Sequence, residues 1–512
     1  MLIKIFASAV FGIEAQKITI EVEISRGAKF FLVGLPDNAI KESQHRIEAA
    51  LRTNGYTFPI KRIVINMAPA DVRKEGASYD LPLALGILAA SGQIKTDKFD
   101  KYMIMGELSL DGTLRPIRGV LPIALNAAKE GFKGIIVPIQ NAKEAAVIEN
   151  LEVIGVKSLV ETIAFLENKK SIPPTVINLQ EEFFNKIETY EADFADVKGQ
   201  ETVKRALEIA AAGGHNILMV GPPGSGKTML AKRMPSILPP LTLAEAIETT
   251  KIHSVAGKLP PNKSLLTERP FRSPHHTISD VALVGGGAYP QPGEISLAHN
   301  GVLFLDELPE FKRSVLEVLR QPLEDRVINI SRAKFSVQYP ASFMLVAAMN
   351  PCPCGYYNHP EKECVCSINA IKKYLNKISG PLFDRFDIHI EVIPVPFKDL
   401  TNQQKAETSA QIRERVIKAR KIQQERFRDY PNIHYNAQMN SKLISKFCKI
   451  DQTSLSLLKN AMEKFGLSAR AYDRILKVSR TIADLEGSEN ITPSHIAEAI
   501  QYRSLDKESW GT

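Results

Sequence analysis

The sequence contains few cysteines and no long apolar segment. Five cysteines occur in 512 residues, four of them between positions 352 and 366 and the fifth at Cys448. This distribution excludes a disulfide framework and favours a reducing compartment, with a metal site at the clustered thiols. No apolar run is long enough to cross a bilayer, and Lys4 is the only residue that could serve as the charged start of a signal peptide. We therefore expect a cytoplasmic protein without a membrane partner.

Neither sign of charge dominates the composition. The formal net charge of +8 is mildly basic, which permits nucleic-acid binding without requiring it. The hydrophobic fraction of 44% is ordinary for a globular protein, and the length predicts two to four domains.

A phosphate-binding loop interrupts an apolar segment near the middle of the chain. Residues 221–228 fit G-x-x-x-x-G-K-[ST], between a predicted strand at 215–220 and a predicted helix start at 228–232. The glycines let backbone N–H groups converge on an anion, the lysine reaches the β- and γ-phosphates, and the threonine can ligate Mg²⁺. The sequence therefore predicts an ATP and Mg²⁺ site. Its loop residues are Gly221, Pro222, Pro223, Gly224, Ser225, Gly226, Lys227 and Thr228.

An acidic pair follows about 80 residues further on. Residues 301–305 predict a buried strand that ends directly at Asp306 and Glu307, which is the Walker B pattern. Asp306 would hold Mg²⁺, and Glu307 would polarise the attacking water. The next buried strand is predicted at 341–349 and ends at Asn350.

Several segments around these motifs resemble AAA+ ATPases. Residues 193–200 resemble the segment that flanks the adenine in that class, and Asn350 falls where it has sensor 1, the residue that orients the lytic water. The resemblance makes Arg385 the arginine-finger candidate, acting on a neighbouring subunit's nucleotide, and this implies a ring. Arg470 falls on the sensor 2 position, where it would contact the γ-phosphate, with Arg474 as the second choice.

The first 168 residues predict a mixed α/β domain that resembles the proteolytic domain of Lon-type proteases. The resemblance rests on residues 74–80 and 106–119. Ser78 falls on the position of the Lon serine, but Leu121 stands where the lysine should be. A Ser–Lys dyad needs that lysine as general base. We therefore expect a Lon-like fold without peptidase activity, in which Ser78 is a turn residue; an ATP-dependent protease is the weaker alternative.

Residues 269–300 resemble the magnesium-chelatase-like ATPases. Together with the Lon-like domain, they make the chain similar to the YifB/ComM family over essentially its whole length. The resemblance implies an α/β multidomain protein with a Lon-protease-like domain, an AAA+ P-loop αβα sandwich and a helical lid. The expected boundaries are 1–168 for the Lon-like domain, 169–190 for a linker, 191–398 for the AAA+ core and 399–512 for the lid.

The same resemblance implies a function. ComM-type members are hexameric helicases that drive branch migration during natural transformation. It follows that the chain would be an ATP-driven DNA motor, acting as a homo-hexamer on single-stranded or branched DNA. The alternative is a chelatase-like ATPase that remodels a protein partner or inserts a metal. The lack of a long acidic linker and of an integrin-like domain weakens this alternative without excluding it, because both belong to separate chelatase subunits.

A basic hairpin is predicted between the acidic pair and Asn350. Two alternating runs within 326–337 flank residues 331–334. Arg332 and Lys334 at its tip would contact DNA phosphates, which gives affinity without sequence preference. The alternative is an exposed hairpin whose charges are only solvated.

The clustered cysteines directly follow the strand that ends in sensor 1. Cys352, Cys354, Cys364 and Cys366 could together form a Cys₄ zinc site, although C-x-C is tighter than the usual ligand spacing. His359 could replace one ligand, and loop packing without a metal is the remaining alternative.

Overall fold

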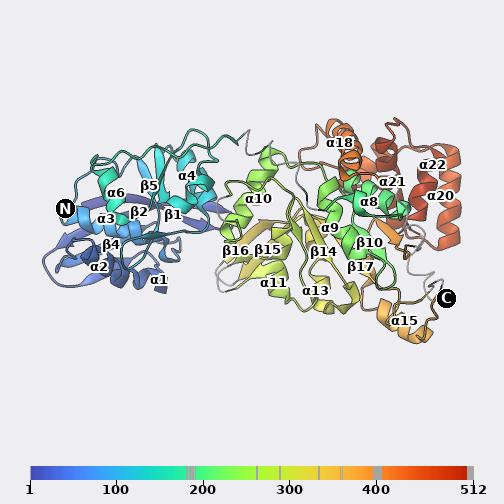
Figure 1. The fold of residues 1–512 in the computed structure, drawn as a ribbon, viewed down its shortest axis with the longest axis horizontal. Helices are drawn as coiled ribbons and strands as arrows, with labels where there is room; N and C mark the ends of the chain where they lie inside the picture. The colour runs from blue at the N-terminus through green and yellow to red at the C-terminus, as the bar shows by residue number, and fades with distance from the viewer. Residues whose placement is uncertain are drawn as a thin grey trace. The chain divides into compact units, whose positions relative to one another are not determined.

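A computed structural model of the chain separates into two compact units (Figure 1). The structure describes residues 2–179, 183, 190, 192–260, 263–287, 290–332, 335–357, 359, 361–395 and 406–503. The first unit comprises residues 1–187, 242–267 and 290–292, and the second comprises 188–241, 268–289 and 293–512. Within the described ranges, no helix combines the length and the apolar character that a membrane span needs.

A mixed seven-stranded sheet forms the centre of the first unit, in the order β3-β4-β2-β1-β5-β8-β9. β1 and β2 form an antiparallel hairpin, β2 is also antiparallel to β4, and the remaining neighbours are parallel. The strands are β1 (Leu2–Phe11), β2 (Glu14–Ser25), β3 (Phe30–Val33), β4 (Arg62–Ala68), β5 (Tyr102–Ile104), β8 (Gly134–Pro138) and β9 (Glu152–Val156).

Close helix packing covers this sheet. Along β2, Ile18, Ile20 and Val22 are fully buried on one face, as the alternating sequence requires. Helix α3 (Asp80–Ala90) lies against them, and a side chain at its Gly86 would come within 2.6 Å of Val22 Cγ2. This close approach explains why the helix consists of small and aliphatic residues. The other long helices of the sheet region are α2 (Ser43–Thr53), α4 (Val120–Lys129) and α6 (Leu159–Leu166).

The Lon-like positions carry no general base. Ser78 lies in a 3₁₀ turn, and its carbonyl accepts the N–H of Gly106 at 2.8 Å. Leu121 is fully buried. Lys74, four residues before Ser78, is also fully buried and donates to the carbonyl of Gly34 at 2.9 Å. Leu121 has only a hydrocarbon side chain, and Lys74 is hydrogen-bonded to backbone carbonyls. Neither side chain therefore serves Ser78 as a general base, which fits Ser78 as a turn residue.

One helix of the first unit comes from the middle of the ATPase sequence. α10 (Leu243–Val255) contacts α4 and belongs to the first unit, although the P-loop precedes it and Asp306 follows it. The Ser254 hydroxyl donates to Glu144 Oε1 at 2.5 Å, and the same carboxylate oxygen accepts the N–H of Leu121 at 3.0 Å. These bonds satisfy a buried carboxylate, so they fix the inserted helix specifically. The sequence did not indicate this packing.

The second unit contains a five-stranded sheet in the order β11-β14-β17-β10-β18, parallel throughout. Because all strands run the same way, their carboxyl ends share one edge and their amino ends the other. The strands are β11 (Phe271–Arg272), β14 (Val302–Leu305), β17 (Met344–Met349), β10 (Ile217–Val220) and β18 (Ile388–Glu391).

A group of helices forms the C-terminal part of the second unit (Figure 1, orange to red) and packs on two earlier helices that contact the sheet. α18 packs on α8, α9 and α21, and α22 packs on α20 and α21. The helices are α8 (Glu201–Gly213), α9 (Lys227–Ile237), α18 (Ser409–Arg426), α20 (Gln452–Phe465), α21 (Ala469–Leu485) and α22 (Pro493–Gln501). The predicted helical C-terminal region is confirmed.

The predicted hairpin is also confirmed. β15 (Val327–Arg332) and β16 (Phe335–Pro340) are antiparallel, and their register ends with Arg332 opposite Phe335. Arg332 is thus the last paired residue of its strand. Lys334 lies outside the described residues, so its proposed DNA contact stays a prediction.

Candidate active site

The P-loop begins where the buried strand β10 ends. Gly224 and Gly226 have φ values of 79° and 90°, which favour glycine and let the loop turn into helix α9 at Lys227. A side chain at Gly221 would lie 2.2 Å from the carbonyl oxygen of Val392, so only glycine fits this position. The loop therefore has the close-packed backbone and the helix N-terminus that a phosphate cradle requires.

Lys227 lies over this loop. Its Nζ donates to the carbonyls of Gly221 at 2.7 Å and Pro222 at 2.9 Å, and lies 3.3 Å from Asn350 Oδ1. Burial lowers the pKa of Lys227, and the charge of Asp306 opposes that shift. The ammonium group of Lys227 is largely removed from water and lies beside carboxylates and the glycine-rich loop. It is therefore suited to bind a polyphosphate.

The Walker B residues meet the same loop. Asp306 directly follows strand β14; its Oδ2 accepts the Thr228 hydroxyl at 2.6 Å, and its Oδ1 accepts the N–H of Glu307 at 2.9 Å. Hydroxyl and carboxylate oxygens are the ligands that Mg²⁺ takes beside nucleotide phosphates. Glu307 has a φ of 53°, and its side chain is 58% exposed. The donor set fits Mg²⁺, and Glu307 is free to reach a water.

Strand order brings these residues together. β14, β17 and β10 are adjacent, so Asp306, Asn350 and the P-loop all lie at the carboxyl edge of the sheet. His276, which the sequence motifs do not mark, also lies here, with its Nδ1 3.6 Å from Glu307 Oε2. In the sequence it is only the second of two adjacent histidines, and its proximity to Glu307 depends on tertiary packing.

The predicted arginines lie at the opposite, amino edge of the same sheet. Arg385 precedes β18 and forms an ion pair with Glu324. Arg470 donates to Asp384 at 3.3 Å, and Arg474 donates to Asp387 at 2.6 Å. These arginines line a hollow of about 490 Å³, which we call the arginine hollow; its cationic residues are Arg326, Arg385, Arg470, Arg474 and Lys477.

Crowding of like charges marks the arginine hollow. Burial lowers the pKa of Arg385, and the charges of Arg474 and Arg470 lower it further. Such a cluster of guanidinium groups suits an anion with several negative charges. Neither Arg385 nor Arg470 lies beside the P-loop of its own chain, because the sheet separates its two edges.

Buried polar bonds connect this hollow to the helical lid. His215 contacts Asp387 at 3.2 Å through Nδ1 and the Thr481 hydroxyl at 2.8 Å through Nε2. Burial alone would raise the pKa of Asp387, but the charge of Arg474 and the bond from His215 outweigh it and hold the pKa well below its usual range. Asp387 is therefore a buried anion that fixes the orientation of Arg474.

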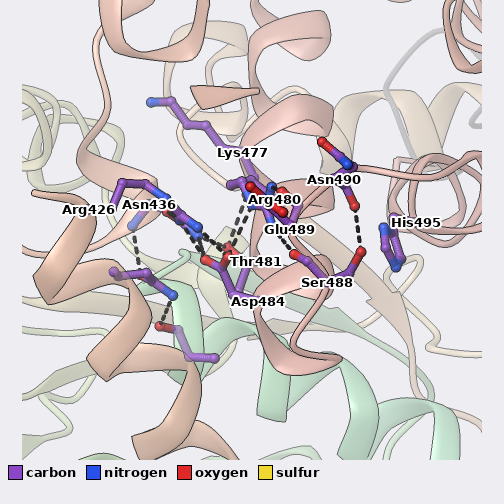
Figure 2. A network of polar contacts seen from close by, with 12 residues as sticks. Arg426, Asn436, Lys477, Arg480, Thr481, Asp484, Ser488, Glu489, Asn490 and His495 are labelled. Carbon is purple, nitrogen blue, oxygen red and sulfur yellow. Dashed lines mark hydrogen bonds and ion pairs between the residues drawn. The ribbon is translucent and has the colours of Figure 1, made fainter. Parts of the chain in front are cut away.

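In the lid, the carboxylate of Asp484 pairs with two arginines, as Figure 2 shows. Asp484 accepts two hydrogen bonds from Arg426, at 2.5 and 2.7 Å, and one from Arg480 at 3.1 Å. Asn436 also donates to Asp484, at 2.8 Å. Arg426 belongs to α18 and Arg480 to α21, so this network connects two long helices of the lid.

Replacing Asp484 by alanine is expected to destabilise the lid. The change leaves Arg426 and Arg480 buried without their carboxylate, and removing one partner of a buried ion pair costs about 3–5 kcal/mol. Hydrogen exchange of the amides of α18 and α21 would measure this loss. As a matched control, Glu463→Ala breaks an exposed pair with Lys459 in α20 and is expected to cost less than about 1 kcal/mol. Equal protection in the two variants would contradict the role of Asp484.

The four clustered cysteines lie next to this site. Their Sγ atoms are all within 4.8 Å of one another, directly after Asn350. His359 is not among these ligand atoms; its Nδ1 accepts the N–H groups of Glu361 at 3.0 Å and Lys362 at 3.1 Å.

Comparison with known proteins agrees with this architecture. The model of magnesium chelatase subunit ChlI matches residues 193–400, that of subunit ChlI of Mg-chelatase matches 20–141, and that of the ChlI C-terminal region matches 406–503.

Individual relatives match over nearly the whole chain. The competence protein ComM of Haemophilus influenzae is 47% identical over 98% of this chain and 97% of its own length. The protein YifB of Escherichia coli is 44% identical over 98% of this chain and 96% of its own length. Lon protease 2 of Bacillus subtilis is 32% identical over 24% of this chain and 22% of its own length. The chain therefore belongs to the magnesium-chelatase-like AAA+ ATPases, in the family that contains ComM and YifB.

Proposed function

We propose that this protein is an ATP-driven, ring-forming DNA motor that moves branch points and aids the integration of DNA during recombination. The observation that supports it most is the division of the predicted catalytic residues between two edges of one sheet. Lys227 and Asp306 lie at the carboxyl edge, whereas Arg385 and Arg470 lie at the amino edge. A complete site then needs the arginine hollow of a neighbouring copy, as in a homo-hexamer.

Each residue at the carboxyl edge has a task in hydrolysis. The backbone N–H groups of the P-loop and the ammonium of Lys227 would hold phosphate oxygens. Thr228 and Asp306 would hold Mg²⁺, which would neutralise charge on the phosphate oxygens of ATP. Asn350 would orient the attacking water, and Glu307 would accept its proton.

The residues of the arginine hollow would act in trans. Arg385 would stabilise the charge that develops on the phosphoryl oxygens at the neighbouring P-loop, and Arg470 would contact the same group. Ion pairs with Glu324 and Asp384 hold these guanidinium groups within one chain. At a subunit interface, the guanidinium groups of Arg385 and Arg470 would release these carboxylates and bind phosphate oxygens instead. This exchange would couple hydrolysis to movement between subunits.

DNA is proposed as the partner on two grounds. The first is the similarity to the competence protein ComM of Haemophilus influenzae, which is 47% identical over 98% of this chain. The paired register of the β15–β16 hairpin ends at Arg332, and the sequence places Lys334 two residues further on. These two cations would contact phosphates of a strand in the ring's channel without reading bases.

Branch migration on a labelled three- or four-stranded junction tests the proposal. Wild-type protein with ATP is expected to move the branch point, and Glu307→Gln is expected to bind the junction without moving it. Intact ATP hydrolysis that is indifferent to DNA, with no branch movement, would contradict a DNA motor. It would favour the chelatase-like alternative, in which the ring remodels a protein or metal-insertion partner.

The hairpin provides a second arm of this test. Combined Arg332→Ala and Lys334→Ala should weaken DNA binding, and the slope of affinity against salt should fall by about one for each lost phosphate contact. A matched control removes Lys418 and Lys459, whose side chains are 70% and 73% exposed on lid helices. Unchanged DNA affinity and unchanged DNA-stimulated hydrolysis in the hairpin variant would exclude the contact.

A further inference from the structure

The sulfur atoms of the cysteine cluster have the spacing of a single-metal site. The Sγ–Sγ distances are 3.3 Å between Cys352 and Cys354, 3.6 Å between Cys354 and Cys364, and 3.7 Å between Cys352 and Cys364. Cys366 completes the group within 4.8 Å. A tetrahedral zinc ion with Zn–S bonds of about 2.3 Å holds its sulfurs about 3.8 Å apart. Three of the sulfurs are therefore spaced much as the corners of such a tetrahedron, and the fourth lies within 4.8 Å of them.

The four sulfurs are not joined in disulfides. A disulfide would need sulfurs about 2.05 Å apart, and these cysteines are all free.

The cluster touches the P-loop. We call residues 352–366 the cysteine knuckle. Gly355 in this knuckle has a φ of 86°, and a side chain there would lie 2.5 Å from Cδ of Pro223 in the P-loop. The knuckle therefore lies in direct contact with the backbone turn that would hold phosphates.

Both ends of the cysteine knuckle are attached to the ATPase core. At its start, Asn350 directly follows the last residue of β17. At its end, the Ser367 hydroxyl accepts the N–H of Ala370 and caps helix α15 (Ile368–Leu375), which carries Tyr374. A fixed knuckle would thus hold sensor 1, α15 and the P-loop together.

We propose that Cys352, Cys354, Cys364 and Cys366 bind one structural Zn²⁺, and that the ion makes the cysteine knuckle a rigid support for the P-loop through Gly355 and Pro223. Zinc binding releases the protons of the thiols to solvent and involves no redox change. The support role rests on the proposed nucleotide site, but the presence of zinc does not, so the two are tested separately.

Elemental analysis of the full-length protein, purified without chelators, tests the metal. Wild type and Cys448→Ser, which removes the one cysteine outside the cluster, are each expected to carry one zinc per chain. Cys364→Ser combined with Cys366→Ser is expected to carry none. Substoichiometric zinc in wild type, iron in its place, or a disulfide among the four cysteines would each overturn the proposal.

Gly355→Ala tests the support role while leaving every ligand in place. The variant is expected to keep one zinc per chain but to lower kcat/KM for ATP by roughly 10- to 100-fold, because its methyl group displaces Pro223. Gly131→Ala is the matched control: its φ is 78°, but nothing lies within 4 Å of an added side chain. An equal effect of both changes on kcat/KM, or no effect of Gly355→Ala, would overturn the support role even if zinc is present. If only branch migration failed, the zinc content and the effect of Gly355→Ala on kcat/KM for ATP would be unaffected.

Discussion

Glu307→Gln is expected to lower kcat for ATP hydrolysis by about 10²- to 10⁴-fold, the usual contribution of a general base. The amide keeps the size of the side chain and its left-handed backbone position after β14, where the N–H of Glu307 donates to Asp306. It loses the ability to accept a proton. Lys227, Thr228 and Asp306 are unchanged, so nucleotide affinity should stay the same.

Steady-state hydrolysis and direct nucleotide binding measure the two quantities separately. Glu310→Gln is the matched control, because Glu310 is three residues further on and pairs with Lys377 at the surface. It should leave kcat unchanged. If Glu307→Gln retained kcat, the proton would have to pass to another group. His276, with its Nδ1 3.6 Å from the carboxylate of Glu307, would be the first to examine.

The sequence predicted the residues at the carboxyl edge because each belongs to a contiguous pattern. The P-loop, Asp306 and Asn350 each follow directly on an apolar strand. In a parallel sheet, strand ends of the same polarity share an edge, so their proximity could be expected without knowing the strand order. A different local pattern, two runs of alternating apolar residues, predicted the hairpin.

Residues whose neighbours are distant in sequence could not be predicted in this way. Nothing in the sequence of α10 indicates that its Ser254 bonds to Glu144 of the first unit. The contact of Gly355 with Pro223 depends on the path of a loop between β17 and α15. Such contacts depend on packing between elements rather than on a local period or motif.

The sequence also could not show where in the fold the arginines lie. Arg385 and Arg470 were predicted from motif positions alone, and motif positions do not state which edge of the sheet they occupy. Their edge follows from Arg385 preceding β18 and from the bond of Arg470 to Asp384, which lies just before the same strand. A ring was expected in general terms. This placement makes the expectation specific: two neighbouring chains share each ATP site.

Arg385→Ala is therefore expected to lower kcat by about 10³-fold or more, the range measured for arginine fingers. Arg385 is paired with Glu324 in the single chain and lies at the edge away from the P-loop, so ATP binding to its own P-loop should be unaffected. Arg52→Ala, an exposed arginine paired with Glu48 on α2, is the control for charge removal and should leave kcat unchanged. Loss of nucleotide affinity in Arg385→Ala would argue for a role within its own chain.

Mixing two inactive variants distinguishes action in trans from action in cis. Lys227→Ala damages the P-loop and keeps Arg385, whereas Arg385→Ala keeps the P-loop. If each site combines Lys227 of one chain with Arg385 of its neighbour, random rings of both variants in equal amounts contain about one intact site in four. The mixture should then recover about a quarter of the wild-type hydrolysis, although neither variant is active alone. Action within one chain predicts no recovery at any ratio, because every chain then carries one defect.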